Sequence, residues 1–190
     1  MELSRTVHAK KIKATRISRG LPVYNAGLGE NPTPTPPSLV DALCQHASKK
    51  RYASAEGIPE LQAHFPNQSL IVGNGLKPLL MVVQLAFHRL CPDGVVVHVI
   101  PSWVSYMEQT TLLDIPTVQL DTTASEWRLT PDALRSFLET KGLRSKQHLI
   151  ILNSPNNPTG YVHTDEEMKA FAEVFTEFGT TVVYDNIYEH

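Results

Sequence analysis

Hydrophobic positions along the chain alternate between short, continuous apolar runs and longer segments with helical spacing. Apolar runs of this length, closed by turn-forming residues, are typical of buried parallel strands. The predicted strands lie at residues 69–72, 95–100, 117–120, 148–152 and 180–185. Segments with helical spacing separate them and predict helices at residues 75–90, 104–113, 131–140 and 165–178. This alternation predicts an α/β fold in three layers, in which helices flank a mostly parallel sheet with right-handed crossovers.

Local signals define the ends of two of these helices. Thr130 followed by Pro131 predicts an N-cap with proline at the first helical position. Thr164 and Glu167 have the spacing of a capping box, and Gly179 is placed to stop the helix that they begin. Both helices are therefore expected to start where these polar residues stand.

The N-terminal part of the chain has a different pattern. Residues 27–37 are rich in glycine and proline, which predicts an extended, irregular strap. A helix is predicted from Ser38, its N-cap, to residue 50, and a short helix at residues 58–65. We therefore predict an N-terminal arm and strap, residues 1–37, followed by a larger domain, residues 38–190.

The loop of residues 153–160 directly follows the apolar run at residues 148–152. In open α/β sheets, ligands bind at the carboxyl ends of the strands. Prolines and a glycine restrict the shape of this loop, so Asn156 and Asn157 present their amide groups at fixed positions. The loop is therefore predicted to hold a ligand.

Composition and charge exclude some classes of partner. Of 190 residues, 42% are hydrophobic and 19% charged, which is ordinary for a globular protein. A formal net charge of −2 gives no electrostatic reason to expect nucleic acid or an acidic membrane as partner. Because aromatic residues do not interleave it, the N-terminal basic cluster is predicted to be a solvated segment, with Lys10, Lys11, Lys13, Arg16 and Arg19.

Cysteine content and hydropathy favour a cytoplasmic location. The chain has 2 cysteines, which argues against a disulfide framework. Its apolar runs are shorter than a membrane span, and its N-terminus lacks the pattern of a signal peptide. The histidines lack metal-ligand spacing, so no metal site is expected.

Several segments together resemble the fold-type-I pyridoxal-phosphate enzymes, specifically the class I/II aminotransferases. They follow the family's order and lie at residues 29–32, 52–61, 73–77, 101–106, 153–160 and 185–188. The resemblance implies the large domain of that fold, truncated before its last strands. It also implies pyridoxal 5'-phosphate as the cofactor, and amino-group transfer between an amino acid and a 2-oxo acid.

The start of the helix at residues 75–90 is the predicted phosphate site. Gly75, Leu76 and Lys77 open this helix directly after a predicted strand, where main-chain N–H groups converge. Gly73 and Gly75 allow the backbone to approach closely. The resemblance implies that Gly75, Leu76 and Lys77 hold the cofactor phosphate, mainly through main-chain groups.

Side chains at the carboxyl ends of the strands are predicted to surround the pyridine ring of the cofactor. The resemblance implies that Trp103 stacks on the ring face. Asp185 is predicted to pair with the ring nitrogen, because a protonated ring is the better electron sink. Tyr188 lies one turn beyond Asp185, so Asn157 and Tyr188 are predicted to donate to the phenolic oxygen of the cofactor.

Other assignments rest on the resemblance alone. In the family, the tyrosine that matches Tyr52 reaches the cofactor phosphate of the other subunit, which implies a homodimer. Gly29 matches a position whose backbone borders the substrate carboxylate, and Asn157 is expected to contact the substrate as well.

The residues that complete the family's active site are expected beyond His190. The resemblance implies a lysine that forms the imine with the cofactor, and an arginine that pairs with the substrate carboxylate; no residue of this chain stands in either context. We therefore assign no catalytic residue and expect the chain to be inactive alone. Two strands are also expected beyond His190, between those at residues 69–72 and 180–185, whose edges would then be apolar and unpaired.

Other interpretations remain open. Carbon–sulfur lyases, synthases and decarboxylases of fold type I share the same residues. Another interpretation is a truncated, non-catalytic homologue that binds a partner subunit or retains only cofactor binding. A nucleotide-binding Rossmann domain fits poorly, because residues 73–77 lack the third spaced glycine.

Overall fold

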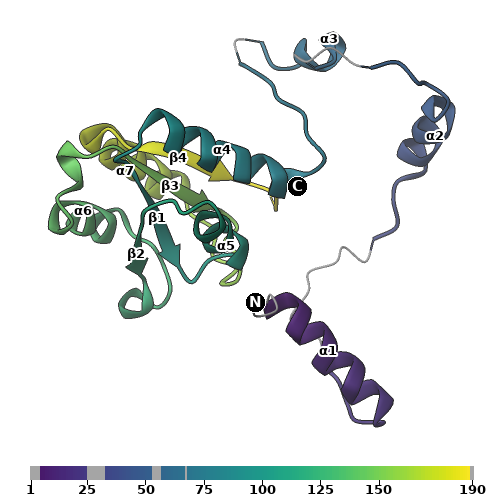
Figure 1. The fold of residues 1–190 in the computed structure, drawn as a ribbon, viewed down its shortest axis with the longest axis horizontal. Helices are drawn as coiled ribbons and strands as arrows, with labels where there is room; N and C mark the ends of the chain where they lie inside the picture. The colour runs from purple at the N-terminus through teal and green to yellow at the C-terminus, as the bar shows by residue number, and fades with distance from the viewer. Residues whose placement is uncertain (1–4, 25–32, 53–56, 67, 189–190) are drawn as a thin grey trace. The chain divides into compact units, whose positions relative to one another are not determined.

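The chain divides into two units, Met1–Ile71 and Val72–His190 (Figure 1). The structure is a computed structural model and describes residues 5–24, 33–52, 57–66 and 68–188. The predicted division between residues 1–37 and 38–190 stays a prediction.

The first unit contains the helices α1 (Arg5–Ser18), α2 (Pro37–His46) and α3 (Pro59–Gln62). No residue that the structure describes in this unit is buried. The basic cluster lies on α1, a helix that the sequence pattern did not predict, and its charged side chains reach solvent as expected. Both α2 and α3 end earlier than predicted, since no buried face supports a further turn.

The predicted N-cap at Ser38 is wrong. Pro36 is the N-cap of α2 and Pro37 its first residue, so Ser38 already lies inside the helix. The physical reason is that proline fixes φ near its helical value and lacks the N–H that a capping side chain would satisfy.

The second unit is built on a sheet of four parallel strands in the order β2-β1-β3-β4. The strands are β1 (Val95–Ile100), β2 (Thr117–Asp121), β3 (His148–Asn153) and β4 (Thr181–Asp185). Each agrees with its predicted range to within one residue at either end. Two short 3-10 helices, η1 (Thr123–Ser125) and η2 (Leu143–Ser145), lie in the connections.

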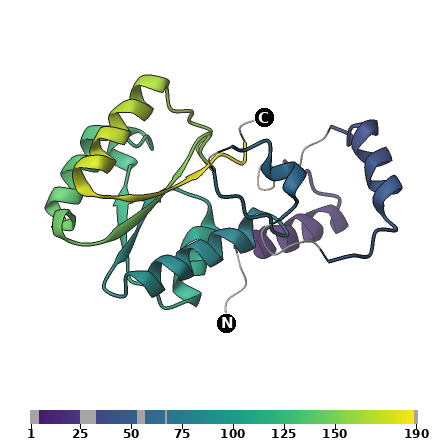
Figure 2. The ribbon, with the colours of Figure 1, turned by 90° about the horizontal axis from the view of Figure 1, so that it is seen from above.

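Helices cover both faces of this sheet, which confirms the predicted three layers (Figure 2). One face packs against α4 (Leu76–Leu90) and α5 (Val104–Leu112). The other face packs against α6 (Pro131–Thr140) and α7 (Asp165–Phe178). No helix in the described part of the chain is both long and apolar enough to cross a membrane.

Strand residues alternate between two hydrophobic cores. Val96 and Leu149 belong to the core beneath α4 and α5, whereas Val97 and Ile150 belong to the core beneath α6 and α7. Successive strand side chains point to opposite faces, so a strand that is apolar throughout needs a helical layer on each side. The continuous apolar runs of the sequence are explained in this way.

The predicted capping residues of α6 and α7 are confirmed. The side chain of Thr130 accepts a hydrogen bond from the main-chain N of Ala133 at 3.2 Å. Thr164 and Glu167 form the reciprocal bonds of a capping box at the start of α7. Gly179 ends that helix with a φ of +62°, which glycine adopts at low cost.

The predicted strand at residues 69–72 is wrong. These residues are neither helix nor strand, and β1 to β4 make up the whole of the sheet that the structure describes. A strand exists only with a hydrogen-bonded neighbour, and no strand of this sheet pairs with that segment. The other expected edge is present, since β4 ends the sheet and leaves Val182 and Tyr184 exposed.

Candidate functional site: a cavity at the carboxyl end of the sheet

A cavity of about 210 Å³ opens where β3 and β4 end and α4 and α5 begin. All four side chains predicted to surround the cofactor ring belong to its lining, which consists of Leu76, Trp103, Tyr106, Asn153, Asn157, Asp185, Ile187 and Tyr188. An apolar cavity of about 150 Å³ is large enough to hold benzene, so this one has room for a pyridine ring. No lysine belongs to the described lining.

Asp185, the last residue of β4, is the buried anion of this cavity, with 3% of its surface exposed. Its Oδ2 accepts a hydrogen bond from the hydroxyl of Tyr106 at 2.5 Å, and its Oδ1 accepts one from the main-chain N of Ile187 at 3.1 Å. Its main-chain O accepts a hydrogen bond from Asn153 Nδ2 at 2.7 Å. These bonds fix the position of the carboxylate and leave it acceptor capacity for a further donor.

Tyr106 is a donor that keeps its proton. Burial raises the pKa of its hydroxyl, and the hydrogen bond to Asp185 and the charge of that carboxylate raise this pKa further. A hydroxyl that stays neutral donates its one proton to the carboxylate beside it. The pair therefore behaves as a carboxylate held by a permanent donor.

Trp103 precedes α5 as its N-cap and lines the cavity with its half-buried side chain. Its ring meets the ring of Tyr106 edge to face, with centroids 5.5 Å apart at 89°. The Nζ of Lys77 lies 5.4 Å from the centroid of the indole. The packed tyrosine thus orients the indole, which offers the cavity an aromatic surface.

Asn157 and Tyr188 come together at the mouth of the cavity. Asn157 Nδ2 donates to the hydroxyl of Tyr188 at 3.0 Å. The backbone of Asn157 is held in turn, because its N donates to Asn153 Oδ1 at 2.7 Å. Two hydrogen-bonding groups from different loops therefore face the same point of the cavity.

The first turn of α4 meets the geometric requirements of an anion site. Gly75 is the N-cap with a φ of +100°, a conformation that side chains other than glycine rarely adopt. A Cβ on Gly73 would lie 2.8 Å from the side chain of Leu79, so a larger residue there would have to displace that side chain. The first N–H groups of a helix have no intrahelical partner, and Leu76 and Lys77 supply two of them, whereas Pro78 has none to offer.

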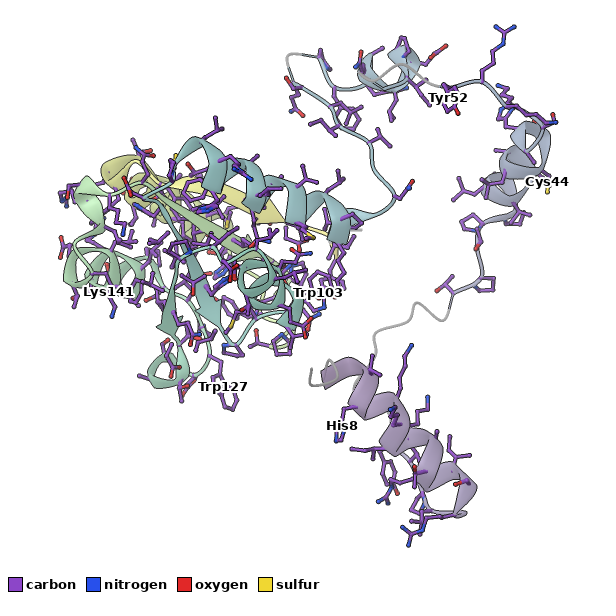
Figure 3. All side chains as sticks on the ribbon, in the orientation of Figure 1. His8, Cys44, Tyr52, Trp103, Trp127 and Lys141 are labelled. Carbon is purple, nitrogen blue, oxygen red and sulfur yellow. The ribbon has the colours of Figure 1, made fainter. Side chains whose placement is uncertain are left out.

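Gly75 and Lys77 flank Leu76 but do not line this cavity. Two further predicted site residues are not placed at it by the structure. Tyr52 belongs to the first unit, and its side chain is fully exposed (Figure 3). Gly29 lies outside the described residues. The roles of both remain predictions.

Tyr106 and Asn153 line the cavity, but the sequence analysis predicted no role for either residue. Asn153 ends β3, and Tyr106 lies one helical turn after Trp103 on α5. That spacing puts Trp103 and Tyr106 on one helix face and was the available signal. The spacing does not reveal the contact with Asp185, because that residue lies 79 positions from Tyr106 in the sequence.

Within the described ranges, no group of His, Cys, Asp and Glu residues is arranged to hold a metal ion.

The chain belongs to the class I and II aminotransferases: the model of that family, "Aminotransferase class I and II", matches residues 22–190. Among curated proteins, it is 30% identical over 203 positions to the aspartate aminotransferase of Bacillus sp. (strain YM-2), covering 98% of this chain and 49% of that protein. It is 32% identical over 203 positions to a bifunctional aspartate aminotransferase and glutamate/aspartate-prephenate aminotransferase of Petunia hybrida, covering 98% of this chain and 41% of that protein.

Solved structures give the same family. Aspartate aminotransferase from Thermus thermophilus with maleate superposes with a TM-score of 0.79 at 28% identity, covering 100% of this chain and 52% of that one. The chain thus spans about half the length of the relatives it matches. Pyridoxal 5'-phosphate is the cofactor of this family.

The described residues fit this cofactor. A buried carboxylate with free acceptor capacity suits a protonated ring nitrogen, and the indole of Trp103 suits the ring face. Leu76 lines the same cavity from the first turn of α4, so the amide groups that suit a phosphate lie at its border.

Proposed function

We propose that this chain is the N-terminal, cofactor-binding part of an aminotransferase that moves an amino group between an amino acid and a 2-oxo acid. The observation that carries the proposal is the joint placement of Trp103, Asn157, Asp185 and Tyr188 around one cavity. Aspartate is the first amino donor to test, because relatives matched above are named aspartate aminotransferases.

Each side chain has a distinct task in this proposal. The amides that open α4 hold the phosphate, Trp103 packs on the ring, and Asp185 keeps the ring nitrogen protonated. Asn157 and Tyr188 donate to the phenolic oxygen. When bound, the cofactor supplies an electron sink for the bond-breaking step at the substrate α-carbon. The residues of this chain thus bind and orient the ring and hold a proton at its nitrogen.

Other parts of the proposal concern the complete protein. Tyr52 contributes to the phosphate site of the second subunit in a homodimer, and the main chain of Gly29 together with Asn157 borders the substrate. A cytoplasmic location follows from the cysteine content and stays a prediction. Because lysine is missing from the described cavity lining, we expect this chain to bind the cofactor without forming an imine.

Titration of the 190-residue chain with pyridoxal 5'-phosphate tests the binding. Trp127 is exposed and lies away from Trp103 (Figure 3). Variants that retain only one tryptophan therefore compare the fluorescence quenching at the two positions. Trp127→Phe, which retains Trp103, should be quenched more strongly than Trp103→Phe, which retains Trp127. Asp185→Asn should weaken binding about tenfold, because it loses a charge-assisted hydrogen bond to the ring. The matched exposed change Asp114→Asn should bind like the wild type.

Borohydride reduction separates the competing interpretations. After incubation with the cofactor and reduction, peptide mapping should find no lysine that is labelled stoichiometrically. A single specifically reduced lysine within residues 1–190 would instead indicate self-contained covalent chemistry. Absence of any cofactor binding would favour a non-catalytic homologue and would contradict the proposal.

A further inference from the structure

A buried polar network lies behind the cavity, between α4 and α5. Gln84 on α4 and Gln109 on α5 are 0% and 5% exposed. Gln84 Nε2 donates to Gln109 Oε1 at 2.7 Å, and Gln109 Nε2 donates to the main-chain O of Lys77 at 2.8 Å. Burial of a polar group costs free energy unless it is hydrogen-bonded. Both amide atoms of Gln109 are bonded, which joins the two helices, whereas Gln84 Oε1 has no partner among the described residues.

The atom that Gln109 holds belongs to the predicted phosphate site. Lys77 lies in the first turn of α4, directly after Leu76, which lines the cavity. Its carbonyl is therefore restrained by a side chain of the neighbouring helix, and the amides of that turn are restrained with it.

The same face of α5 also contacts Asp185, at the end of β4. Tyr106 stands one turn before Gln109 and donates to Asp185 at 2.5 Å. Residues three positions apart on a helix lie on one face, about 4.5 Å apart along its axis. A single helical turn thus contacts both the start of α4 and the end of β4.

We propose that Gln109 and Tyr106 are positioning residues through which α5 sets the spacing between the phosphate site and the ring-nitrogen site. Gln109 acts through the main chain of Lys77, and Tyr106 acts through the carboxylate of Asp185. This inference rests on the proposed function, because it assigns those two sites to one ligand.

The two positioning residues are expected to control different parts of the ligand. Loss of the Gln109 bond loosens the first turn of α4 and should affect only the contribution of the phosphate. Loss of the Tyr106 hydroxyl frees the carboxylate of Asp185 and should affect only the contribution of the ring nitrogen.

Binding of three ligands to the 190-residue chain tests this separation. Pyridoxine 5'-phosphate lacks the aldehyde, so it forms no imine. Pyridoxine also lacks the phosphate, and a carbocyclic analogue of pyridoxine 5'-phosphate carries carbon in place of the ring nitrogen. Calorimetry gives the Kd of each ligand; the Kd of pyridoxine divided by that of pyridoxine 5'-phosphate is the phosphate preference, and the Kd of the carbocyclic analogue divided by that of pyridoxine 5'-phosphate is the nitrogen preference.

Gln109→Leu should lower the phosphate preference about tenfold and leave the nitrogen preference unchanged, as expected for one buried hydrogen bond. Tyr106→Phe should lower the nitrogen preference by a similar factor, about tenfold, and leave the phosphate preference unchanged. Gln119→Leu and Tyr184→Phe, which change exposed residues of the same types, should match the wild type in both ratios.

Gln109→Asn is a second variant in case the apolar substitution disturbs folding. It keeps a polar amide but is one methylene too short to reach the carbonyl of Lys77, so it should reproduce the loss of phosphate preference. If the variants lower both ratios alike, or change neither, the inference is overturned while the proposed function stands. If the wild-type chain binds none of the ligands, the proposed function fails and the inference fails with it.

Discussion

His98 makes the stability of the second unit dependent on pH. It lies on β1 with 2% of its surface exposed, and its Nε2 is 3.0 Å from the hydroxyl of Thr110 on α5. Burial lowers the pKa of His98 from 6.5 to about 4. The folded protein therefore keeps this imidazole neutral under conditions in which the unfolded chain protonates it.

The direction and size of the effect follow from this pKa difference. Below pH 6.5 the unfolded state binds a proton that the folded state refuses, so stability is lost as the pH falls towards 4. The slope is about 1.4 kcal/mol per pH unit within that window. Between pH 7 and pH 5, His98 alone should lower the free energy of unfolding by about 2 kcal/mol.

Urea unfolding of the wild type and of His98→Gln at pH 7, 6 and 5 measures this contribution. Glutamine stays neutral and reaches the hydroxyl of Thr110, so the variant should lose about 2 kcal/mol less stability than the wild type over this range. His8→Gln, at an exposed position on α1, controls for the loss of a histidine elsewhere. Parallel stability curves for the wild type and His98→Gln would refute the reasoning, because they would mean that His98 titrates alike in both states.

Local substitutions test the remaining structural claims. Leu134→Ala removes a fully buried side chain from the core beneath α6 and α7, and should lower the free energy of unfolding by about 2–5 kcal/mol in urea. Thr164→Ala deletes the capping box and should cost about 1 kcal/mol, seen as a lower thermal midpoint, whereas Thr176→Ala on the exposed side of α7 should change it much less. Gly179→Ala places a Cβ at a φ of +62° and should cost about 1–2 kcal/mol by the same unfolding assay; an unchanged midpoint would show that the backbone there relaxes without strain.

Local patterns predicted the elements of the second unit well, for a physical reason. The apolar runs that became β1 and β3 are buried on both faces, so their composition reflects burial directly. The capping box of α7 depends on residues within one turn, and Gly179 depends only on its own backbone conformation. Such signals lie within a few positions of the structure that they specify.

The failure at residues 69–72 came where a distant neighbour decides the structure. Residues 69–72 have the composition of a strand but pair with no strand of the sheet, and local propensity cannot supply a partner. The failure at Ser38 is local, because Pro36 and Pro37 begin α2 before that residue. The early ends of α2 and α3 again depend on the rest of the fold, since no surface packs against a further turn.

The candidate site divides in the same way. Local periodicity shows which residues stand at the ends of strands and helices, and the resemblance of these segments to the class I/II aminotransferases indicates the family. The contacts of Tyr106 with Asp185 and of Gln109 with the carbonyl of Lys77 arise only when the chain is folded. Contacts between residues so far apart depend on the order of the strands and the packing of α4 against α5, which no local pattern encodes.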